Sequence, residues 1–126
     1  FQYLEGRFMT NTYLAIFLGS KTSPRAAAWF ALPEAERRKK EQEGMAGWKA
    51  WVDQHKDAIL ELGGPLGKTK KISAGGIEDI SNDLGAFTLV RAASHDEAAK
   101  LFLNHPHFTI FPGDRVELMP VMPIPG

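Results

Sequence analysis

The sequence contains no cysteine, which excludes disulfide bonds and thiolate chemistry. It has no net charge, because 15 Lys and Arg residues balance 15 Asp and Glu residues. That balance gives no electrostatic footprint for nucleic acid or for an anionic membrane. The apolar run from Leu14 to Leu18 is far shorter than the roughly 20 residues of a membrane-spanning helix. We therefore expect a cytoplasmic protein with neither a nucleic-acid nor a membrane partner.

What is present is ordinary globular composition, with 126 residues, 44% hydrophobic and 24% charged. This length suits one domain with its own hydrophobic core. Residues 1–8 precede Met9 and begin with Phe-Gln, which is typical of the remnant of a protease-cleavage tag. We expect a single domain over residues 9–126.

The first half of the chain predicts one strand followed by helices. Tyr13–Leu18 is apolar without alternation, which favours a central strand covered on both faces. Ser23-Pro24 is a helix start, and a short helix through Phe30 should follow. The charged segment 34–43 predicts a solvent-exposed helix, and Gly44 either separates it from the next helix or only lowers its propensity. The next helix has an apolar face at steps of three and four residues, formed by Met45, Trp48, Val52, His55, Ile59 and Leu62.

The second half predicts three strands and one helix. Gly63-Gly64-Pro65 should end the long helix, and Lys68–Ser73 should form a polar edge strand before a loop at 74–84. The remaining elements are a half-buried strand at Ala86–Ala92, a helix with a Ser94–Glu97 capping box that ends at Pro106, and a strand at Arg115–Met119. The proline-rich end, 120–125, should be extended.

This order predicts an α+β, ferredoxin-like βαββαβ fold with a helical insertion after the first strand and a four-stranded antiparallel sheet. Two helices cover only one face of such a sheet. The strands nevertheless carry apolar residues on both faces, so we expect the second face to bind a second copy of the chain in a homodimer.

Five ordered motifs resemble the YCII-related (DGPF-domain) family: 45–51 (MAGWKAW), 62–67 (LGGPLG), 70–74 (KKISA), 84–87 (LGAF) and 116–123 (VELMPVMP). The resemblance implies a dimeric α/β barrel, and some members of this family are lyases or dehydrochlorinases. Classical members pair a histidine near the start of the long helix with an aspartate. Here Gly47 and Trp48 stand nearest that histidine, and 77–84 replaces the Asp-Gly-Pro-Phe signature. The family's catalytic couple is therefore not carried over.

The residues themselves suggest another couple. His55 could act as a general base at neutral pH, with Asp79 or Asp83 orienting it. The alternative is a core histidine bonded to the backbone. Trp48, Trp51 and Phe87 could line a ligand pocket, with Trp29 forming a lid, or these aromatic residues could serve packing alone.

These observations predict a homodimer that binds a small organic ligand between the long helix and the sheet. Any chemistry would be cofactor-independent acid–base catalysis of the lyase or isomerase kind. The alternative is a non-catalytic regulatory or protein-interaction module. No cofactor is expected. His105-Pro106-His107 with Asp114 superficially resembles a metal site, but proline constrains the backbone and the two rings need not converge, so no metal is expected.

Overall fold

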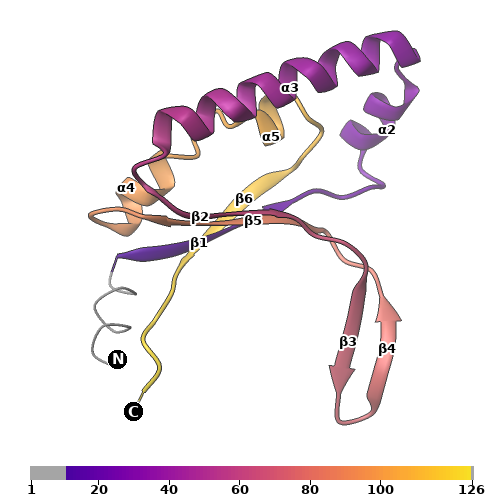
Figure 1. Cartoon of the computed structure of the whole chain (residues 1–126). Helices are drawn as coiled ribbons and strands as arrows, with labels where there is room; N and C mark the ends of the chain where they lie inside the picture. Colours follow the sequence, from indigo (N-terminus) through magenta and orange to yellow (C-terminus); the bar gives the residue numbers. More distant parts are fainter. Residues whose placement is uncertain (1–10, 126) are drawn as a thin grey trace.

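The structure is a computed structural model that describes residues 11–125 (Figure 1). The suggested tag remnant at 1–8 lies outside the described residues. A four-stranded antiparallel sheet has the order β2-β5-β1-β6, which is the strand arrangement expected of a ferredoxin-like fold. Its strands are β1 (Thr12–Leu18), β2 (Ile59–Pro65), β5 (Leu84–Arg91) and β6 (Arg115–Pro120).

Strand β1 is central, as its continuous apolar sequence predicts. It pairs with β5 on one side, where Ala15 lies opposite Thr88, and with β6 on the other, where Ala15 lies opposite Leu118. Because side chains alternate along a strand, Tyr13, Ala15 and Phe17 share one face of the sheet. All three are buried in the hydrophobic core.

The helices lie on that same face (Figure 1). The long helix α3 (Glu34–His55) packs Trp51 into the core, while Ala98 of α4 (His95–Lys100) and the following Phe102 complete it. The Trp51 indole Nε1 donates to the Leu101 carbonyl oxygen at 2.7 Å and so ties α3 to the end of α4. The prediction of helices on a single face is confirmed.

Two predicted helix starts are also confirmed. Helix α2 (Pro24–Ala31) begins after Ser23, whose hydroxyl accepts the Ala26 backbone N–H at 3.1 Å. Helix α4 begins after Ser94, whose hydroxyl accepts the Glu97 N–H at 3.1 Å. Each cap satisfies a backbone donor that the first helical turn leaves unpaired.

The prediction that the long helix extends to Leu62 is wrong. Helix α3 ends at His55, and Ile59 and Leu62 belong to β2, the second strand of the sheet. Their spacing continues the helical period by coincidence, because β2 is irregular and shifts its register twice against β5. Gly63 lies within this strand at φ 68° rather than ending a helix. Gly44 does not interrupt α3, which is continuous across it.

Two further boundaries differ from expectation. The strand β3 (Thr69–Ser73) is not in the main sheet but pairs with β4 (Gly76–Ile80), in the segment expected to be a loop. Gly75-Gly76, interpreted as loop residues, form the turn side of this hairpin. Pro106 does not end the preceding helix but begins the short α5 (Pro106–Thr109), since proline suits a first helical position.

The second face of the main sheet carries apolar side chains that no helix of the described residues covers (Figure 1). These side chains alternate with the core-facing positions along β1, β5 and β6 and pair with one another across the strands: Leu14, Ile16, Phe87, Leu89 and Met119. We call this set the open face. Within residues 11–125, no helix is both long enough and apolar enough to cross a membrane.

Candidate functional site

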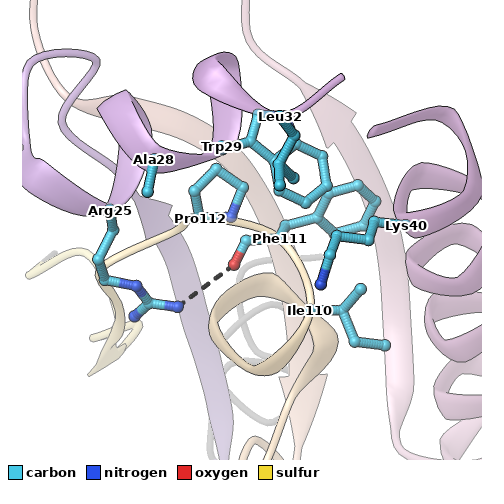
Figure 2. Close-up of a pocket in the computed structure, with 8 residues that line it drawn as sticks. All are labelled: Arg25, Ala28, Trp29, Leu32, Lys40, Ile110, Phe111 and Pro112. Atoms are coloured by element: carbon cyan, nitrogen blue, oxygen red, sulfur yellow. Dashed lines mark hydrogen bonds between the residues drawn. The ribbon is translucent and has the colours of Figure 1, made fainter. Parts of the chain in front are cut away.

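A cavity of about 290 Å³ lies between α2, the middle of α3 and the loop that follows α5 (Figure 2). Its volume is near the lower end of small-molecule sites, roughly 300 Å³. The residues that line it come from three separate parts of the chain: Arg25, Ala28, Trp29, Leu32, Lys40, Ile110, Phe111 and Pro112. We call this cavity the α2–α3 pocket.

Two cations line the α2–α3 pocket, and its described lining holds no carboxylate. The Arg25 guanidinium Nη2 donates to the backbone oxygen of Phe108 at 2.5 Å and of Phe111 at 3.4 Å. These bonds hold the guanidinium at one side of the pocket, and the Lys40 side chain extends along the other (Figure 2). Among residues 11–125, neither cation has a carboxylate partner within ion-pair distance, so both can pair with an anion from solution.

The remaining wall is apolar and aromatic. The Trp29 ring is 9% exposed and lies 5.8 Å from the Phe111 ring, centroid to centroid, at an interplanar angle of 48°. Leu32, Ile110 and Pro112 extend this surface. An aromatic wall next to cations favours a planar ligand that carries a negative charge.

Behind the α2–α3 pocket lies a cluster of aromatic and imidazole rings. Phe111 contacts Trp48 with ring centroids 6.2 Å apart, and Trp48 in turn lies 4.5 Å from His105 in an edge-to-face arrangement. Trp51 contacts the same imidazole at 4.7 Å. The space between α3 and the sheet is therefore filled by side chains.

His105 is fully buried in this cluster, with 0% of its surface exposed. Its Nδ1 accepts the backbone N–H of His107 at 3.0 Å, so the neutral ring carries its proton on Nε2. The Nε2 atom has no hydrogen-bond partner among the described residues. Burial, followed by the nearby His107 and His55, lowers the pKa of His105 to about 4. The ring is neutral at physiological pH.

His107 is the polar link between this cluster and the sheet. Its Nε2 lies 2.8 Å from the Leu18 carbonyl oxygen, to which it donates. Burial lowers the pKa of His107, against the opposing effects of the Leu18 bond and of Asp114. Asp114 is held in place by the Ser20 backbone N–H at 2.8 Å. These bonds join the end of β1 to the loop that lines the pocket.

The aromatic residues predicted to bind a ligand lie in three different places. Trp29 lines the α2–α3 pocket, whereas Trp51 belongs to the core and Trp48 packs against it. Phe87 lies on the open face, opposite Ile16 and on the far side of the sheet from the helices. Of these four residues, the structure therefore brings only Trp29 to the α2–α3 pocket. Trp48 lies behind the pocket wall, in contact with Phe111.

The structure of the chain does not bring the predicted couple together. His55 ends α3 and precedes β2, whose Ile59 pairs with Val90 near the end of β5, whereas Asp83 precedes Leu84 at the start of β5. At about 3.3 Å per residue, these positions are roughly 20 Å apart along the sheet. Asp79 lies on β4, where its carboxylate pairs with Lys70 at 2.7 Å.

His55 is half-buried, and its ring lies 5.3 Å from that of Trp51. Asp79 and Asp83 instead share a groove of about 910 Å³ at the base of the β3–β4 hairpin. The roles proposed for these three residues in catalysis stay predictions.

Sequence interpretation missed Arg25, Lys40 and Phe111. One signal was available for Arg25, which lies in the first turn of α2, where the helix dipole disfavours a cation and no acidic residue of that turn compensates it. Lys40 gave no signal, because it lies in a run of mixed charges that suits any exposed helix. Phe111 reaches the pocket only through tertiary packing of the α5–β6 loop.

Comparison with known proteins finds little similarity in sequence. No protein-family model matches the chain, and no curated protein matches it. Among solved structures, it is similar to 5-chloro-2-hydroxyhydroquinone dehydrochlorinase from Burkholderia phenoliruptrix AC1100, in complex with 2,5-dihydroxybenzoquinone. The two share 18% sequence identity, the match covers 86% of this chain and 90% of that chain, and the TM-score is 0.48.

Proposed function

We propose that this chain is a homodimeric domain of the YCII-related type that binds a small planar organic anion, such as an aromatic carboxylate, in the α2–α3 pocket. The observation that carries the proposal is the pairing of Arg25 and Lys40 with an aromatic wall whose described lining includes no acidic residue. The guanidinium already bonds two backbone oxygens through Nη2, so it is fixed before a ligand arrives. Fixing a binding group in advance reduces the entropy lost on association.

The dimer is supported by the open face. Leu14, Ile16, Phe87 and Leu89 lie side by side on the two central strands of the sheet. A contiguous apolar surface of this kind is rare on a monomer and is usually buried by a partner. A second copy related by a two-fold axis is the simplest partner, because one surface then serves both sides of the contact.

Catalysis would need features beyond the α2–α3 pocket. Acid–base chemistry through His55 would need an acidic partner other than Asp79 or Asp83 of the same chain, because Asp83 precedes the far end of β5 and Asp79 lies on the separate β3–β4 hairpin. The filled core around Trp48 and Trp51 favours the alternative of a non-catalytic regulatory or interaction module. Ligand binding in the α2–α3 pocket is compatible with either role.

Calorimetric titration with benzoate and with benzamide tests the ligand class. Benzoate should bind, and neutral benzamide of the same shape should bind at least about tenfold more weakly, because only the benzoate carboxylate carries a charge that the cationic lining attracts. Arg25→Gln and Lys40→Gln should each weaken benzoate binding by roughly three- to tenfold, since both pairs would be partly exposed to solvent. Raising the salt concentration should weaken benzoate binding further.

Lys39→Gln is the matched control for Lys40→Gln, because Lys39 is the neighbouring exposed lysine of α3 and does not line the pocket. It should leave benzoate affinity within about twofold of the unaltered chain. Equal affinity for benzoate and benzamide, or equal losses in the Lys39 and Lys40 variants, would contradict the proposed ligand class.

A further inference from the structure

The β3–β4 hairpin extends away from the main sheet, on the side of the open face and opposite the helices (Figure 1). It forms a two-stranded sheet of its own, and every residue of its strands except Thr69 is exposed. An isolated two-stranded hairpin is at best marginally stable in water. A hairpin in this position is therefore expected to be supported by something outside the single chain.

The two surfaces of the hairpin differ in chemistry. Lys71 and Glu78 form a cross-strand ion pair on one surface. On the other, the cross-strand pair Ile72–Ile77 lies one step beyond the Lys70–Asp79 ion pair. Ile72 is 77% exposed and Ile77 is 71% exposed, so the hairpin holds two large apolar side chains side by side in water.

We propose that this hairpin is a dimer arm, and that Ile72 and Ile77 pack against a second copy of the chain. The inference rests on the homodimer proposed above. A body that covers the open face lies beside the hairpin, because both project on the same side of the sheet (Figure 1). Two-fold symmetry then places the hairpin of each copy against the body of the other copy.

Charge also favours a neutral partner surface. The four charged side chains of the hairpin form two ion pairs with one another, Lys70–Asp79 and Lys71–Glu78, and leave no net charge to attract an ionic partner. The whole chain likewise has a net charge of zero. The isoleucine pair is therefore the part of the arm that remains available for contact, and it would stabilise a dimer through burial of apolar surface.

The groove at the base of the hairpin adds exposed apolar side chains beside the arm. It has a volume of about 910 Å³ and is lined in part by Leu66, Ile80 and Leu84, each of which is exposed. Ile80 lies on the same surface of the hairpin as the Lys71–Glu78 pair, because side chains alternate along β4, so it does not extend the isoleucine pair.

Two double variants provide a matched test by sedimentation equilibrium. Ile72→Ser with Ile77→Ser removes the cross-strand pair assigned to the interface, and Lys71→Ser with Glu78→Ser removes the adjacent pair on the other surface. Neither changes the net charge, and each removes one cross-strand contact. The isoleucine variant should raise the dimer dissociation constant at least about hundredfold, since two copies each lose two buried side chains. The ion-pair variant should change it less than about threefold.

The absence of cysteine allows a second, independent readout. An environment-sensitive fluorophore attached to Ile77→Cys should shift its emission to the blue as concentration rises through the dimer dissociation constant, and one attached to Glu78→Cys should not. A dimer unaffected by the isoleucine variant, with equal emission at both labels, would overturn the arm but leave the homodimer standing. A chain that is monomeric at all concentrations before any substitution would overturn both.

Discussion

His105 combines complete burial with a bond that leaves one ring nitrogen without a partner among the described residues. An unpaired buried donor destabilises the folded state by about 1–3 kcal/mol. The aromatic contacts around the His105 ring must offset this free energy. Phe17, Trp48, Trp51 and Phe102 all contact the imidazole. The neutral ring suits these apolar surroundings and the charged ring does not.

The lowered pKa of His105 predicts acid sensitivity. The folded-state pKa of about 4 lies below the ordinary histidine value of 6.5, so the unfolded chain binds the proton first as pH falls. The free energy of unfolding should decrease between about pH 6.5 and pH 4, by at most about 3 kcal/mol from this residue. Urea denaturation at pH 7 and pH 4.5 measures the loss.

His105→Asn is the informative variant, because the asparagine oxygen can accept the His107 N–H in place of Nδ1 but does not titrate in this range. The variant should be less stable at pH 7 and should lose less stability on acidification. A pH dependence equal to that of the unaltered chain would show that another group is responsible.

At the scale of elements, the close approach of α3 to the α5–β6 loop depends on Gly44. A Cβ atom at Gly44 would lie 2.5 Å from two carbons of the Phe111 ring, which is held between Trp29 and Trp48. Gly44→Ala should destabilise the fold by about 1–2 kcal/mol despite the higher helix propensity of alanine, because the clash must displace Phe111. It should also weaken benzoate binding in the α2–α3 pocket.

Gly64→Ala is the control for this experiment, since a Cβ atom at Gly64 would meet no atom of the described residues within 4 Å. Chemical denaturation of the two variants compares them directly. If Gly44→Ala were as stable as the unaltered chain, the packing of Phe111 against α3 would be looser than the structure has it.

The elements also show what sequence patterns can predict here. β1, β5 and β6 were predictable because their positions and buried faces follow from alternation and apolar runs, and Ser23 and Ser94 marked two helices by their capping chemistry. The end of α3 was not predictable from spacing, since Ile59 and Leu62 fit a helix as well as an irregular strand. The sequence pattern also did not show that β2, rather than β3, pairs with β5 in the main sheet, because such pairing depends on tertiary contacts.

The candidate site was less predictable than the fold. Trp29 was identified, but the α2–α3 pocket joins distant segments, as in the Arg25–Phe111 bond between residues 86 positions apart. His55 was predicted from its chemistry and its place on the apolar face of the long helix, and Asp79 and Asp83 from their chemistry. Neither signal gives the distance between the residues, which strand register sets. Sites assembled by packing leave little trace in a single sequence.

At the scale of the whole molecule, the open face makes a direct prediction. Leu89→Lys places a charge in the centre of the proposed dimer interface and should raise the dimer dissociation constant at least about hundredfold. Leu103→Lys is the same substitution at a leucine that is 68% exposed after α4, and it should leave the dimer intact. Size-exclusion chromatography with light scattering distinguishes the two, and equal behaviour would contradict dimerisation through the sheet.

The position of β1 has a consequence for how the chain is made. β1 comes first among the described strands, yet both of its neighbours come late, since Tyr13 pairs with Val90 and with Pro120. During synthesis on the ribosome, this apolar strand must wait unpaired until β5 and β6 have emerged. Contacts of such long sequence separation slow folding, so the nascent chain should complete its sheet only after β6 has emerged, and until then β1 is exposed to aggregation.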